Sequence, residues 1–242
     1  MKRLRVMWAS GLVMSFAGAA GTGLAAGHPG VHQRLNAAAQ VFKDMAAPPG
    51  RRIPAHLLSR ARCVVIIPNA KEGALIVGAE YGAGFLSCRE GTNGAWSAPG
   101  GISLNRGTIG AEIGAGTKDI VMLAMNERAK DALLAPQSKL GTSVSALAGP
   151  VGHAPANMEA GLLTWTHSNG AFAGVSLKGS DLSQDNDANR ALYGRALSNI
   201  EIVSGKVAVP PAAGTLMAAL RDYSTRSVRA SRMRRQTRTV NK

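Results

Sequence analysis

The chain has 242 residues, of which 45% are hydrophobic, 4% are aromatic and 29 are glycine. This length accommodates one domain of ordinary size with tails, and the scarcity of aromatic residues requires a core built mainly from Val, Ile, Leu and Ala. The formal net charge of +14 favours an anionic partner, and after the first 26 residues no apolar stretch is long enough to cross a bilayer.

Residues 1–26 have the pattern of a secretory signal peptide. Three basic residues within the first five precede an apolar stretch over residues 6–20, and small residues follow at a cleavage position. The apolar stretch is short for a membrane span of about 20 residues, so we expect cleavage rather than anchoring. This predicts an exported protein, located in the periplasm or peripheral to the cell envelope.

The next segment predicts two helices. Residues 31–46 place apolar side chains at three- and four-residue steps, which is typical of an amphipathic helix. Residues 47–52 form a basic hinge, and Pro54 suits the first turn of a second short helix. We therefore expect residues 27–52 to be a basic amphipathic helix with its hinge.

From residue 63 the chain consists of short apolar or β-branched runs interrupted by glycine. Glycine within a helix costs about 1 kcal/mol relative to Ala, whereas in a strand it marks a bulge, a bend or a close backbone approach. The pattern predicts an α+β fold with a curved, mostly antiparallel sheet, open or barrel-like, flanked by a few helices. The expected strands are 63–67, 74–80, 83–88, 101–104, 107–114, 118–124, 139–148, 162–167 and 171–178.

Three further helices are expected between and after these strands. Asn126 can cap a helix that ends near Leu134, and the acidic start of residues 185–197 suits a helix N-terminus. Residues 210–223 form the last expected helix, after which residues 223–242 have little apolar content and should be a disordered basic tail.

The two cysteines, Cys63 and Cys88, lie at ends of predicted strands. In an exported chain two cysteines can form a disulfide if those strands adjoin. A pair of buried thiols is the alternative that the sequence leaves open.

Motifs for catalysis and metal binding are missing from the sequence. The words GAEYGAG (78–84) and GAEIGAG (110–116) resemble a nucleotide-binding turn, but strand-like residues follow both, where that turn requires a helix. The chain has no Tyr-x-x-x-Lys pair, no Gly-x-Ser-x-Gly elbow and no metal-like spacing of its histidines. The place of Asp119 near the start of the expected apolar strand 118–124 favours a structural role for its side chain. We expect no catalytic residue, no metal and no cofactor.

Seven words of this sequence together resemble the SYLF-domain family of lipid-binding proteins, whose bacterial members are exported and whose yeast relatives bind actin. The words are IPAHLLSRA (53–61), CVVIIPNAKEGALIVGAEYGAG (63–84), WSAP (96–99), IGAEIGAGTKDIVML (109–123), AGPVG (148–152), NGAFAGVSLKGS (169–180) and NRALYG (189–194). They cover about two thirds of the chain in the family's order, which implies a SYLF-like domain over residues 53–222.

The resemblance implies lipid binding through basic positions near the N-terminal region. The candidate lipid-binding residues are Arg34, Lys43, Arg51, Arg52, Arg60, Arg62 and Lys71. Three basic positions typical of the family are lost, because this chain has Glu80, His153 and the word THSNG (166–170) there. These losses weaken the case for a specific phosphoinositide pocket.

The distribution of charge supports the same expectation. Residues 31–62 contain six Lys or Arg and one Asp, residues 221–242 contain eight and one, and residues 63–220 contain eleven basic and twelve acidic side chains. Each basic group near an anionic membrane contributes about 1 kcal/mol. Nucleic acid would attract the same charges, but we do not expect it as the partner of an exported protein. A basic tail that is merely solvated would have the same composition.

We therefore expect non-enzymatic, peripheral binding of an anionic lipid, either phosphoinositide-like or another acidic phospholipid. The helix over 31–46 either inserts its apolar stripe shallowly into the membrane or packs on the sheet. Trp96 is either an interfacial anchor or an aromatic residue at the edge of the core. An envelope protein-interaction module without lipid specificity is the alternative function.

Overall fold

The computed structural model describes residues 30–46, 53–74, 77–89, 94–109, 114–140, 146–148, 161–168, 171–173 and 179–224. The expected signal peptide, the hinge with Arg51 and Arg52, His153 and the basic tail lie outside the described residues.

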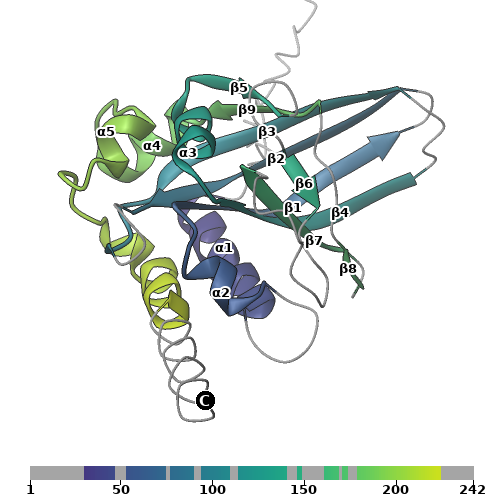
Figure 1. Ribbon diagram of the computed structural model, residues 1–242. Coiled ribbons are helices and arrows are strands. Elements are labelled where there is room, and N and C mark those ends of the chain that lie inside the picture. The colour runs from purple at the N-terminus through teal and green to yellow at the C-terminus, as the bar shows by residue number, and fades with distance from the viewer. Residues whose placement is uncertain are drawn as a thin grey trace, which may run out of the picture.

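The described strands form one nine-stranded sheet in the order β5-β9-β3-β2-β1-β4-β7-β6, with β8 also paired to β7. Neighbouring strands run antiparallel, except for the parallel pair β6–β7. Figure 1 shows the long strands β1–β4 projecting beyond the helices. The strands are β1 (Cys63–Ala74), β2 (Val77–Cys88), β3 (Gly100–Ile109), β4 (Gly114–Ala124), β5 (Gln137–Lys139), β6 (Ala146–Ala148), β7 (Leu162–Ser168), β8 (Ala171–Ala173) and β9 (Asp181–Gln184).

Helices cover both faces of this sheet. The helices α1 and α2 share a core with one face, α3 lies in the core on the opposite face, and α4 and α5 pack on β3. Their bounds are α1 (Val31–Ala46), α2 (Ala55–Leu58), α3 (Glu127–Leu134), α4 (Asn186–Tyr193), α5 (Asn199–Val203) and the 3-10 helix η1 (Pro211–Ala213), after which residues 214–224 are helical. The predicted α+β class with a curved, mostly antiparallel sheet is confirmed.

Strand β1 is the centre of the fold because both of its faces are buried. Val64 and Ile66 join the core beneath α1, whereas Val65 and Ile67 join the core beneath α3. A strand buried on both faces has a continuous apolar run rather than an alternating pattern, which explains the run CVVII at its start.

Strand β1 extends further along the chain than the sequence predicted. The residues Pro68 and Asn69 resemble a turn, but they form an irregularity inside β1, where the register shifts against both neighbouring strands. Asn69 has a φ of 51°, and its backbone N–H donates to Asp119 Oδ1 at 2.9 Å. The expected strand 74–80 therefore spans the last residue of β1 and the start of β2, because β1 ends at Ala74 and β2 begins at Val77.

Other element bounds also differ from the prediction. The expected strand 139–148 is two separate strands, of which β5 pairs with β9 and β6 pairs with β7. The expected strand 107–114 spans the end of β3 and the start of β4. The sequence missed β9, which has a single apolar residue, and α5, whose capping box joins Ser198 and Glu201. The helix expected over 185–197 ends at Gly194, which has a φ of 68°.

A disulfide joins Cys63 to Cys88 and settles the alternative that the sequence left open. The two residues are direct partners in the β1–β2 register, with their Cα atoms 4.0 Å apart. They are the chain's only cysteines, and the bond closes the β1–β2 pair at the end of the register opposite to Ala74 and Gly78.

Reduction of this disulfide should lower the free energy of unfolding by about 3 kcal/mol, because the bond closes a loop with a sequence separation of 25. Urea unfolding with and without reductant measures the change, and mass spectrometry confirms that the bond has opened. Equal midpoints for the reduced and oxidised proteins would contradict it.

A substitution at Gly84 tests how closely β2 approaches the irregular part of β1. A Cβ atom at Gly84 would lie 2.0 Å from the carbonyl oxygen of Ile66, whereas one at Gly116 would meet nothing within 4 Å. Gly84→Ala should therefore destabilise the protein by about 3 kcal/mol, and the control Gly116→Ala should change stability by less than about 0.5 kcal/mol. Thermal unfolding of both variants is the measurement, and equal effects would refute the close approach.

Candidate functional site

The apolar stripe of α1 is part of the protein core. Leu35, Phe42 and Met45 are at most 2% exposed and pack with residues of β1, β2 and β4. The expectation that this stripe inserts into a membrane is wrong, because its residues are already covered by the sheet. The alternative, packing of the helix on the sheet, is what the structure shows.

Among the described residues, the predicted basic side chains do not gather in one site. Arg34 forms an ion pair with Asp185 at 2.8 Å and lies 5.7 Å from the centre of the Phe85 ring, so it joins α1 to α4. Lys43 is half-buried on α1. Lys71 is exposed beside the ring of Tyr81. It lies on β1, nine residues after Arg62, which precedes the strand, and nine residues of extended chain span about 30 Å.

The hairpin instead brings two arginines together at the disulfide. Arg62 directly precedes Cys63, and Arg89 directly follows Cys88. The backbone N–H of Arg89 donates to the carbonyl of Arg62 at 2.9 Å. We call Arg62 and Arg89 the arginine pair; Arg60 lies exposed on the chain just before it.

Arg89 is a buried cation that holds α2 against the end of β2. Its side chain is 4% exposed, and it donates from Nε to Ala61 O at 2.9 Å and from Nη2 to Leu58 O at 2.7 Å. These carbonyls belong to the end of α2 and the residues just after it, where a helix dipole favours positive charge. The guanidinium also lies 4.5 Å from the centre of the Trp96 ring, a cation–π arrangement.

The arginine pair carries more positive charge than its described neighbours neutralise. Arg62 Nε pairs with Glu127 at 3.1 Å, but among the described residues no carboxylate contacts the Arg89 guanidinium. Burial, and secondarily the charge of Arg62, lowers the pKa of Arg89 to about 10. Arg89 therefore stays protonated at neutral pH, and a further anion would relieve the repulsion between the two arginines.

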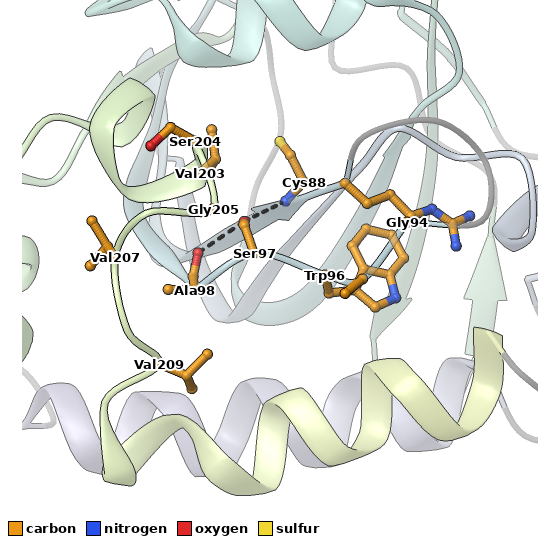
Figure 2. Close-up of a pocket in the computed structure, with 12 residues that line it drawn as sticks. Cys88, Gly94, Trp96, Ser97, Ala98, Val203, Ser204, Gly205, Val207 and Val209 are labelled. Carbon is orange, nitrogen blue, oxygen red and sulfur yellow. Dashed lines mark hydrogen bonds between the residues drawn. The ribbon is translucent and has the colours of Figure 1, made fainter.

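An open pocket of about 490 Å³ lies beside Arg89, which is the member of the pair that lines it. One wall comes from Cys88, Arg89 and residues 94–98, and the other from residues 203–209. Figure 2 shows Trp96 across the pocket from Val207 and Val209. Trp96 is 6% exposed and donates from Nε1 to Ser224 Oγ at 2.7 Å, so it is an aromatic residue at the edge of the core rather than an exposed membrane anchor.

Sequence reasoning missed Arg89 because it lies in the part of the chain with balanced charge. A signal was nevertheless present, since each cysteine has an arginine on its outer side, as Arg62-Cys63 and Cys88-Arg89. If the cysteines pair across two strands, the arginines must become neighbours.

A second polar cluster, around Asn189 in the word NRALYG, holds the helices. Asn189 is fully buried and donates to Leu197 O and to Asn199 Oδ1, and its own Oδ1 accepts the N–H of Gly101. Asn199 donates in turn to the carbonyl of Gly101. Because all these groups bond to one another, the cluster fixes α4 and α5 to β3 and leaves no group directed at a ligand.

Asp119 has the structural role that the sequence favoured. Besides accepting the N–H of Asn69, its Oδ2 lies 3.6 Å from His167 Nδ1 on β7. In the described part of the chain no group of three or more His, Cys, Asp or Glu side chains could hold a metal ion. None of the described helices is long and apolar enough to cross a membrane.

Comparison with known proteins shows which family this chain resembles. The family described as Ysc84, "Las17-binding protein actin regulator", matches residues 105–223. Protein YSC84 of Saccharomyces cerevisiae is 35% identical over 173 residues, covering 68% of this chain and 36% of that protein. The SH3 domain-containing YSC84-like protein 1 of Rattus norvegicus is 31% identical over 185 residues, covering 73% of this chain and 53% of that protein.

A third relative, LAS seventeen-binding protein 3 of Saccharomyces cerevisiae, is 34% identical over 176 residues, which cover 69% of this chain and 38% of that protein. The chain thus matches between about a third and a half of the length of these relatives. No solved structure matches it.

Asn189→Ala should lower the free energy of unfolding by about 3 kcal/mol, because it removes the acceptor of the buried Gly101 N–H and the Asn189 amide that donates to Asn199 Oδ1. Arg190→Ala is the matched control, since Arg190 lies on the same helix in an exposed ion pair with Asp187, and it should cost less than about 0.5 kcal/mol. Urea unfolding separates the two. An Asn189→Ala protein as stable as the control would show that the cluster does not hold α4.

Proposed function

The chain belongs to the SYLF (Ysc84) family, and from that membership and the arginine pair we propose that it binds anionic lipid headgroups without catalysing a reaction. The observation that carries this proposal is a buried, protonated Arg89 beside a second arginine, with no carboxylate among the described residues on the Arg89 guanidinium. Guanidinium groups bind phosphate oxygens through charge-assisted hydrogen bonds.

Preorganisation supports this reading. The disulfide and the backbone hydrogen bond fix the two arginines side by side, and the carbonyls at the end of α2 and just after it fix the orientation of Arg89. Little conformational freedom is then left for the Arg89 side chain to lose when an anion binds. A single anionic group that meets both arginines would lower their mutual repulsion as well as gain its own hydrogen bonds.

The location of the protein belongs to the same proposal. An exported protein with this site would meet anionic phospholipid at the surface of the cell envelope. The basic residues 223–242 would add non-specific attraction, which salt screens within about 8–10 Å at moderate ionic strength.

Protein binding is the second candidate function. The family's description and one relative's name refer to binding of Las17, so an interaction with an envelope protein is the alternative for this chain. Failure to bind any vesicle, whatever its composition, would favour this alternative.

Arg62→Gln should weaken binding to anionic vesicles about fivefold, which corresponds to about 1 kcal/mol for a basic group near the membrane. Arg62 is the more suitable of the pair for mutation, because it is partly exposed and does not hold α2. Co-sedimentation with vesicles of phosphatidylcholine and phosphatidylglycerol, and with phosphatidylcholine alone, is the measurement.

Lys71→Gln is the matched control, because it removes the same charge from a position on β1 far from the arginine pair. It should change vesicle binding by less than twofold. Equal losses for the two variants would mean that attraction is non-specific and that the arginine pair is not the lipid site.

A further inference from the structure

The pocket beside Arg89 has one charged end and one apolar end. We propose that it holds the alkyl chain of a single anionic amphiphile whose charged group is bound by the arginine pair. The inference rests on the proposed function and adds to it a site for the apolar part of the ligand. It means that the protein takes up one amphiphile molecule rather than only resting on a charged surface.

The polar groups of the pocket leave Arg89 as its principal charged contact. Ser97 Oγ donates to Ala98 O and accepts from the N–H of Cys88, and Ser204 Oγ donates to Glu201 O. Both hydroxyls are therefore already engaged by the protein. A ligand's anionic group would be directed towards Arg89, which is the one ionisable side chain among the lining residues.

The far wall supplies apolar surface. Val203 and Val207 are partly buried there, and Val209 is 43% exposed, which makes it one of only three large hydrophobic residues described as exposed. An alkyl chain lying along these valines would bury apolar surface on both partners. Trp96 faces the valines from the opposite wall (Figure 2).

The fold explains why the pocket is open at this point. Ala98, Leu197 and Ile202 form a small core of their own, separate from the two cores that cover the sheet. The segment after α5 leaves this small core through Gly205, whose φ is 78°, and runs past the end of the β1–β2 hairpin. The gap between the small core and the hairpin is the pocket, and its volume is in the range of small-molecule sites.

A series of alkyl phosphates tests the proposal, with inorganic phosphate as the chain-free reference. Each ligand is titrated below its micelle concentration into the full-length protein and followed by calorimetry. Affinity should rise about fourfold for each methylene that enters the pocket and then level off once the pocket is full. Affinity that does not depend on chain length would overturn the proposal.

Two substitutions by tryptophan test where the alkyl chain of the ligand lies. Val209→Trp should fill the mouth of the pocket and weaken binding of the longer alkyl phosphates at least tenfold, while binding of inorganic phosphate stays within twofold of wild type. Ile200→Trp is the matched control, because Ile200 is 57% exposed on α5 and is not a lining residue, and it should leave both affinities within twofold. Equal effects of the two substitutions would overturn the proposal.

Vesicle binding separates failure of this inference from failure of the proposed function. One outcome is that the protein binds anionic vesicles and Arg62→Gln weakens that binding, but the affinity for alkyl phosphates does not depend on the length of the alkyl chain. In that case the headgroup site stands and the proposed site for the alkyl chain is wrong. If the protein binds neither vesicles nor any alkyl phosphate, the proposed function itself is wrong, and so is the proposed site for the alkyl chain.

Discussion

The register of β1 against β2 is the constraint on which the site depends. It sets Cys63 opposite Cys88, and the disulfide that follows makes Arg62 and Arg89 neighbours. That register is itself fixed by burial, because β1 has apolar residues packed on both faces. A slip by one residue would exchange the faces of every side chain, so the core that stabilises the fold also positions the two charges.

Two like charges held together destabilise a protein unless other groups compensate for them. Here the compensation is partial: Glu127 neutralises part of the charge on Arg62, while Arg89 receives two carbonyls and the face of Trp96. These contacts orient the Arg89 guanidinium without removing its charge. The arrangement is the physical basis for proposing an anionic ligand, and the adjoining pocket is the basis for proposing that the ligand has an apolar part.

The sequence predicted elements with clear periodicity and missed features that depend on tertiary pairing. The helix over 31–46 and the strand near 162–167 have strong patterns and were placed to within a residue. The first strand was expected to end at residue 67, but β1 continues past Pro68 and Asn69, where the N–H of Asn69 donates to Asp119. Of the arginine pair, Arg62 was among the predicted residues, whereas Arg89 becomes visible only when the cysteines are known to pair.

The central claim is that an anionic headgroup contacts the arginine pair, and the side-chain Nε–H NMR signals of the arginines test it most directly. Arg89 is suited to this, because its Nε–H is buried in a hydrogen bond to Ala61 O. Addition of a soluble anionic headgroup should shift the Arg62 and Arg89 signals in a saturable way and leave Arg34, which is paired with Asp185, unchanged. Shifts that are equal at all arginines, or that spare Arg62 and Arg89, would contradict the account.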